Sequence, residues 1–188
     1  MSSLTRSAIQ GGLGFGLASL AVFATVAFGE RWMYTHLGLW GAYLAWTVLF
    51  IGLGGGVLLP LAPPSWRGGR FFGLFALAFF LYAASWTAIY FLSKGTRTGE
   101  WAASLGSSVV MAYTFVVALK KPSPSAPLAL VLFLANSLGY FAGSALNDAF
   151  VRPTGMLLWG GVYGLCLGAG LGAVLSLAQS KNAPERVH

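Results

Sequence analysis

One apolar stretch, residues 126–146, carries polar side chains suited to binding a small molecule. Asn136, Tyr140, Ser144 and Asn147 recur at spacings of four, four and three residues. At 100° per residue of a helix, the four side chains fall within about 80° of one another. This stripe, which Asp148 extends, suits hydrogen bonding to a neutral or amphipathic solute. Hydrogen bonding between neighbouring helices would account for the same stripe.

A second polar stripe begins just before the stretch at residues 101–119. Glu100, Ser104 and Ser107 follow one another at spacings of four and three residues, so they share one helix face. Serine can also bond back to its own helix, and a carboxylate is stabilised at a helix N-terminus by the helix dipole. We expect this stripe to face the first one. Glu100 either caps its own helix or joins Asp148 at the outer surface.

Aromatic side chains complete the candidate site. Tyr82, Trp86 and Tyr90 lie one helical turn apart and would form the wall of a binding cavity. Trp159, near the outer end of its stretch, is expected to anchor its helix at the level of the lipid head groups. The candidate ligand-binding residues are therefore Tyr82, Trp86, Glu100, Ser104, Ser107, Asn136, Tyr140, Ser144, Asn147 and Asp148.

Other chemistry is disfavoured by the residues available. The chain has two histidines, His36 and His188, and neither lies in a long apolar stretch; its single cysteine is Cys166. A haem held between membrane histidines, an internal disulfide and a cluster of metal ligands are therefore not expected. We predict no metal, no cofactor and no catalytic residue. An enzyme using an outer-face carboxylate, Glu100 or Asp148, is the least favoured alternative.

The elements that must position these residues are six long apolar stretches. Hydrophobic residues make up 57% of the 188-residue chain, and all 15 charged side chains lie outside the stretches. A helix needs about 20 residues to cross the core of a bilayer. Because lipid offers no hydrogen-bond partners, the backbone N–H and C=O groups of such a span must pair within the helix. We predict an all-α, single-domain (1–188) bundle of six transmembrane helices, with the first stretch retained as a span. The predicted spans are 8–29, 39–62, 71–93, 101–119, 126–146 and 154–178.

The basic residues predict the orientation of the bundle. Seven Lys and Arg residues fall on the side that carries both termini, and four fall on the other side. Because cytoplasmic loops are enriched in Lys and Arg, both termini are expected in the cytoplasm, in a bacterial inner membrane. Because the basic residues flank the predicted spans, the net charge of +7 does not indicate nucleic-acid binding. The seven residues are Arg6, Arg67, Arg70, Lys120, Lys121, Lys181 and Arg186.

Small residues predict where helices pack. Gly160, Gly164, Gly168 and Gly172 recur every four residues and form a groove along one face of the last stretch. Shorter versions of the pattern occur in two other stretches, and they consist of Gly52 with Gly56 and Gly139 with Gly143. Such faces serve either packing within the chain or self-association into a homo-oligomer.

Two non-enzymatic functions fit these features. The first is binding or permeation of a small neutral or amphipathic solute at the polar stripe of residues 126–146. The second is a lipid-binding or scaffold subunit of a membrane complex, whose glycine faces dock partner helices. The lipid bilayer is a partner in both, and the identity of a solute is not encoded in any recognisable motif.

Overall fold

The computed structural model describes residues 2–63, 66, 68–118 and 125–180, and its regular elements are all helical. The predicted all-α fold is therefore confirmed. Within these residues there are five α-helices and one short 3-10 helix. They are α1 (Ser3–Leu58), η1 (Leu59–Leu61), α2 (Gly69–Leu92), α3 (Arg97–Ala118), α4 (Ser125–Ala149) and α5 (Thr154–Ser180).

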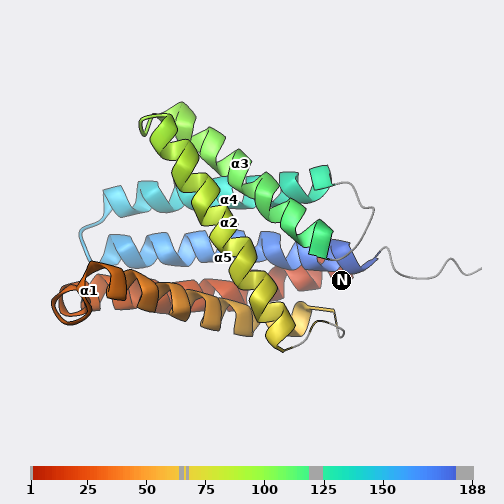
Figure 1. Cartoon of the computed structure of the whole chain (residues 1–188), viewed down its shortest axis with the longest axis horizontal. Coiled ribbons are helices and arrows are strands. Elements are labelled where there is room, and N and C mark those ends of the chain that lie inside the picture. The colour runs from red at the N-terminus through yellow and green to blue at the C-terminus, as the bar shows by residue number, and fades with distance from the viewer. Residues whose placement is uncertain (1, 64–65, 67, 119–124, 181–188) are drawn as a thin grey trace, which may run out of the picture.

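Helix α1 is a hairpin of two antiparallel arms. Its regular geometry is broken at Gly38, where φ is 67° and ψ is 179°, a left-handed conformation that glycine adopts without a steric penalty. Beyond Gly38 the chain folds back, so that the rings of Phe15 and Phe50 meet at 5.2 Å between centroids (Figure 1). The first predicted span, 8–29, therefore lies in the first arm of α1. The second, 39–62, covers the second arm together with the short η1 that follows it.

Five helices among the described residues are long and apolar enough to cross a membrane. The first of them, Ser3–Leu61, has 59 residues, which is more than twice the number that one crossing requires. The other four correspond to the last four predicted spans, with ends that differ by a few residues. The chain therefore has the composition and helix lengths of a membrane protein.

Helix packing follows an order different from the chain order. Helix α5 lies between α1 and α4, while α3 packs on α4 and α2 packs mainly on α3 (Figure 1). Helix α2 crosses the others obliquely and diverges from the second arm of α1. The N-terminal end of α1 and the C-terminal end of α5 lie at the same end of the bundle. A core of phenylalanines, including Phe15, Phe71 and Phe75, fills the space where α2 meets α1.

Glycines allow α1 and α5 to approach closely. A Cβ atom at Gly168 would lie 2.5 Å from the carbonyl oxygen of Gly11, and one at Gly164 would collide with Ser19. The Ser19 hydroxyl donates a 2.8 Å hydrogen bond to the carbonyl oxygen of Gly160. Backbone-to-backbone contact thus replaces side-chain packing along this face, as in other close contacts between membrane helices.

The remaining glycines of interest differ in their surroundings. A Cβ at Gly139 would lie 3.1 Å from the carbonyl oxygen of Tyr163, so this glycine also faces α5, as does Gly143. Gly172 faces the N-terminal turns of α1. In contrast, no atom of the described residues lies within 4 Å of a Cβ at Gly52 or Gly56, so this face of α1 is open among them.

Several residues used for the predicted orientation lie outside the described residues. They are Arg67, Lys120, Lys121, Lys181 and Arg186, and His188 lies outside as well. Arg6 and Arg70 are described, and both lie within a few residues of a helix start.

Candidate ligand cavity

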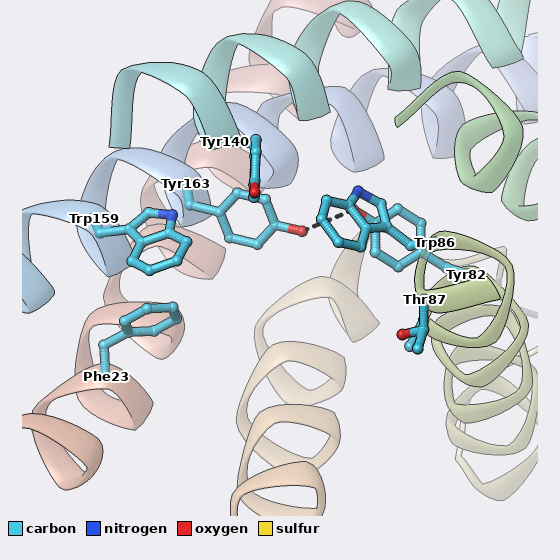
Figure 2. A pocket seen from close by; sticks show the side chains of 8 residues that line it. Phe23, Tyr82, Trp86, Thr87, Tyr140, Trp159 and Tyr163 are labelled. Atoms are coloured by element: carbon cyan, nitrogen blue, oxygen red, sulfur yellow. Dashed lines mark hydrogen bonds between the residues drawn. The ribbon is translucent and has the colours of Figure 1, made fainter. Parts of the chain in front are cut away.

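An aromatic cavity of about 270 Å³ lies where α1, α2, α4 and α5 converge (Figure 2). Each of the four helices contributes at least one aromatic ring to its wall, and none of the lining residues is charged. The lining residues are Phe23, Tyr82, Ala83, Trp86, Thr87, Tyr140, Trp159 and Tyr163, and we call this space the aromatic cavity.

The rings of the aromatic cavity form a continuous series. Phe23 neighbours Trp159 at 5.9 Å between ring centroids, Trp159 neighbours Tyr140 at 6.2 Å, and Tyr140 neighbours Trp86 at 5.3 Å. The angles between their planes range from 55° to 70°, so neighbouring rings meet at a tilt rather than stacking flat. Such contacts stabilise the wall through ring quadrupoles and through buried apolar area.

A larger apolar cavity of about 620 Å³ adjoins the first. It lies between the two arms of α1 and the middle of α2, in the wedge opened by the oblique course of α2. Four residues, Phe23, Tyr82, Ala83 and Tyr163, line both spaces and form the partition between them. The other lining residues are Val22, Val26, Tyr43, Trp46, Thr47, Phe50, Ile51, Ala76, Phe79 and Phe80, and we call this space the apolar cavity.

Two phenol groups place polar atoms at the partition. The hydroxyls of Tyr82 and Tyr163 lie 3.1 Å apart, within hydrogen-bond distance of each other. The Tyr82 hydroxyl also donates a 2.6 Å hydrogen bond to Oδ1 of Asn136. A residue of α4 therefore fixes the position of Tyr82 in the partition. The two phenol oxygens lie between the aromatic cavity and the apolar cavity.

Asn136 is the centre of a buried hydrogen-bond network rather than part of the cavity wall. Its Nδ2 donates to Oγ of Ser104 at 2.7 Å, and that oxygen lies 2.8 Å from Oγ of Ser137. The Ser107 hydroxyl donates to the carbonyl oxygen of Ser104 at 3.2 Å. Asn136, Ser104 and Ser107 are all completely buried. Both ends of the amide are thereby satisfied, and the network joins α2, α3 and α4.

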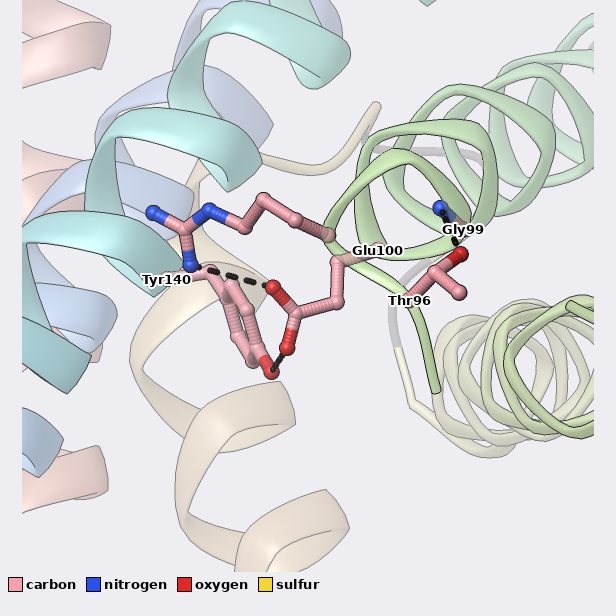
Figure 3. Close-up of polar contacts among 5 residues, drawn as sticks. Thr96, Gly99, Glu100 and Tyr140 are labelled. Atoms are coloured by element: carbon pink, nitrogen blue, oxygen red, sulfur yellow. Dashed lines mark hydrogen bonds and ion pairs between the residues drawn. The ribbon is translucent and has the colours of Figure 1, made fainter. Parts of the chain in front are cut away.

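A charged cluster lies behind the cavity wall at the start of α3 (Figure 3). The Tyr140 hydroxyl donates to Oε1 of Glu100 at 3.2 Å, and Nη1 of Arg97 lies 3.0 Å from Oε2 of the same carboxylate. Thr96 accepts a 3.1 Å hydrogen bond from the backbone N–H of Gly99 and so caps this helix end. The Glu100 side chain is only 17% exposed. The carboxylate is therefore fixed against the cavity's Tyr140.

The outer part of the predicted α4 stripe does not join this site. Ser144 and Asn147 are half-buried, and neither side chain forms a hydrogen bond with the described residues. Asp148 is exposed and forms no ion pair with them. Arg152 instead binds Glu30 of α1 at 3.0 Å. Of the predicted stripe, Tyr140 thus lines the cavity, Asn136 supports it, and the other three lie beyond it.

Comparison with protein-family models, with curated proteins and with solved structures finds no match in any of the three. Function is therefore argued from the geometry of the two cavities. The described residues contain no cluster of His, Cys, Asp and Glu side chains suited to holding a metal ion.

Three of the aromatic residues that line the aromatic cavity were not among the predicted site residues. Trp159 and Tyr163 lie one turn apart on α5, and this spacing in the sequence indicates that they share one face of the helix. Trp159 was expected only as an anchor at the head groups. No pattern in the sequence distinguishes Phe23 as a cavity residue, because it is one of 14 phenylalanines in an apolar chain. Its role follows from the packing of α1 against α5.

Proposed function

We propose that this chain is a six-span protein of the bacterial inner membrane that binds a small amphipathic molecule in the two adjoining cavities. In this proposal both arms of α1 cross the bilayer, and both termini lie in the cytoplasm. The position of the two described chain ends at one end of the bundle supports an even number of crossings. The excess of Lys and Arg on the side expected to carry both termini supports the cytoplasmic location.

The observation that carries the binding proposal is the pair of cavities with polar atoms at their partition. Ligand sites are typically apolar and aromatic spaces in which a few well-placed polar groups fix the orientation. Here the phenol oxygens of Tyr82 and Tyr163 would lie beside the polar end of the ligand and fix its orientation. The apolar cavity, which reaches the middle of α2 near Phe79, would hold its hydrocarbon body. The combined shape suits a molecule with one compact polar end and one apolar end.

Quenching of tryptophan fluorescence by a brominated decanol tests this function, because Trp46, Trp86 and Trp159 all line the cavities. Bromine quenches indole fluorescence on contact. With the protein in nanodiscs, we expect a saturable quenching component on top of the linear component that arises from partition into lipid. Substitution Ala83→Phe, which places a ring in the partition, should abolish the saturable component.

Ala84→Phe is the matched control, since Ala84 is the adjacent residue, is exposed and lines neither cavity. It should retain saturable quenching. Purely linear quenching in the unsubstituted protein, or equal loss in both variants with native thermal stability, would contradict the proposed function.

The scaffold function is the second candidate, and one observation favours it. The open face at Gly52 and Gly56, flanked by exposed Leu49 and Leu53, has the small-residue spacing that lets another helix approach closely. A partner helix or a second copy would cover this face. Single-molecule counting of subunits in native-like membranes, compared between the unsubstituted chain and Gly56→Leu, tests it. A monomer in both cases would remove self-association from consideration.

An enzymatic function finds no comparable support. Glu100 is engaged by Arg97 and Tyr140, while Asp148 is exposed on its own. Within the described residues, the side-chain partners of the Glu100 carboxylate are Arg97 and Tyr140, and Asp148 has none.

A further inference from the structure

We infer that the aromatic cavity holds an organic cation, such as a trimethylammonium group, as the polar end of the bound molecule. This inference rests on the proposed function and deepens it by naming the chemical class of the ligand. The molecule would be an amphipathic cation, with its charged end among the aromatic rings and its hydrocarbon chain in the apolar cavity.

The composition of the wall carries the inference. Six of the eight lining residues are aromatic: Phe23, Tyr82, Trp86, Tyr140, Trp159 and Tyr163. The face of an aromatic ring carries a partial negative charge, and cages of Trp, Tyr and Phe rings are the usual protein sites for quaternary ammonium groups. A neutral polar group would instead call for several hydrogen-bond donors and acceptors. The aromatic cavity offers few of these, since its polar side-chain atoms are limited to phenols, indoles and Thr87.

Electrostatics around the cavity favours a positive ligand. Among the described residues, no Lys or Arg side chain lines either cavity. The carboxylate of Glu100 lies directly behind Tyr140 and accepts a hydrogen bond from its hydroxyl group. Such a bond increases electron density on the tyrosine ring and strengthens its attraction for a cation. Arg97, which neutralises Glu100 in part, is 66% exposed and lies over the ring of Phe141, at 4.2 Å, outside the cavity lining.

The depth of the rings along their helices suits a charged group. Trp86 lies six residues before the end of α2 at Leu92, and Trp159 lies five residues after the start of α5 at Thr154. At 1.5 Å per residue, both rings are within about 9 Å of a helix end. A cation there would be near the head-group level, where charge is tolerated far better than at the centre of the bilayer. The apolar cavity runs along α2 from Ala83 through Phe79, near the middle of the helix, to Ala76.

A pair of ligands that differ only in charge tests the inference. Decyltrimethylammonium and 2,2-dimethyldodecane have the same shape, because a carbon atom in the second replaces the nitrogen of the first. Each would compete with brominated decanol for the saturable quenching of the protein in nanodiscs, with concentrations corrected for partition into lipid. We expect the cation to bind about tenfold more tightly than its neutral counterpart, a preference between those of exposed and of desolvated cation–π contacts.

Variants locate the effect in the ring series. Trp86→Leu should remove most of the preference for the cation over the neutral compound, and Trp86→Phe should restore part of that preference. Trp101→Leu is the control, since this tryptophan contacts Phe133 and Phe141 and lines neither cavity. Its preference for the cation should remain intact.

The outcomes separate this inference from the proposed function. Saturable quenching by brominated decanol with equal affinities for the two competitors would overturn the cation site and leave amphiphile binding standing. Failure of the cation to compete would have the same meaning. Absence of any saturable quenching would overturn the proposed function, and the cation site with it.

Discussion

Asn136 shows how one buried amide links the helices around the cavity. Its oxygen accepts from Tyr82 of α2, and its nitrogen donates to Ser104 of α3. Both atoms of the amide thus have partners, and the side chain is completely buried. The sequence permitted two interpretations of this residue, contact with a solute and bridging of helices. The structure favours bridging at Asn136, while Tyr140, one turn further along α4, lines the cavity.

Substitution Asn136→Leu should therefore destabilise the fold, while the protein that remains folded keeps its saturable binding of brominated decanol. Removal of the amide leaves the buried hydroxyls of Tyr82 and Ser104 with fewer hydrogen-bond partners. We expect the free energy of unfolding to fall by about 1–2 kcal/mol, because an unpaired buried group costs about 1–3 kcal/mol in water-soluble proteins, and hydrogen bonds between membrane helices are usually weaker. Unfolding of the detergent-solubilised protein by SDS would measure the change.

Asn147→Leu is the matched control, because Asn147 is half-buried and its side chain makes no hydrogen bond to the described residues. Its effect on unfolding should be small. If Asn136→Leu instead left stability unchanged and abolished binding, the bridging role would be wrong and Asn136 would contact the ligand.

At the scale of helices, the contact between α1 and α5 positions two sides of the aromatic cavity. Gly164 and Gly168 let α5 approach the first arm of α1 closely, and Phe23 of that arm then reaches Trp159. The glycines and the cavity are thus parts of one arrangement. A larger side chain in the glycine face would separate the helices and move these rings apart.

Gly168→Leu should destabilise the protein by at least about 1–3 kcal/mol, since its side chain would collide with the backbone of Gly11 and with Phe15. Gly56→Leu provides the comparison. Both changes gain the same intrinsic helix propensity, about 0.8–1 kcal/mol, but a side chain at Gly56 enters open space. Thermal unfolding in detergent should show a clear loss for the first variant and little change for the second. Equal behaviour of the two would mean that the α1–α5 contact does not depend on the glycine face.

At the scale of the whole molecule, the turn at Gly38 decides the number of crossings. If each arm of α1 spans the bilayer, the chain crosses six times and its ends share one side. If the two arms together made a single crossing, the ends would lie on opposite sides. The ion pair between Glu30 of α1 and Arg152 of the α4–α5 turn places the hairpin end at the same face as that turn, which supports six crossings.

Reporter fusions test this topology. A reporter active only in the cytoplasm should give signal at either terminus, and a reporter active only outside the cytoplasm should give signal when inserted in the turn at Lys94–Gly95 between α2 and α3. Opposite locations for the two termini would indicate five crossings. Both termini outside, with Lys94–Gly95 inside, would preserve the six spans and reverse the orientation.

The sequence by itself determined the helices. Apolar stretches of about 20 residues form helices in lipid because each backbone group must then be paired within its own segment, a local requirement that can be read one stretch at a time. The ends of the last four predicted spans accordingly agree with α2 to α5 within a few residues. The spacing of the glycines and of the polar residues on one helix face was readable for the same reason.

Only the tertiary structure decided which faces meet. Periodicity places Tyr140, Trp86 and Trp159 on faces of their own helices, but it does not say that α2 crosses obliquely, or that α5 lies between α1 and α4. The polar stripes of α3 and α4 do face each other, as expected, where Asn136 meets Ser104 and Tyr140 meets Glu100. The cavity, however, lies among α1, α2, α4 and α5. Helix pairing depends on how whole surfaces fit together. Since nearly every face here is apolar, hydrophobic pattern alone cannot distinguish one pairing from another.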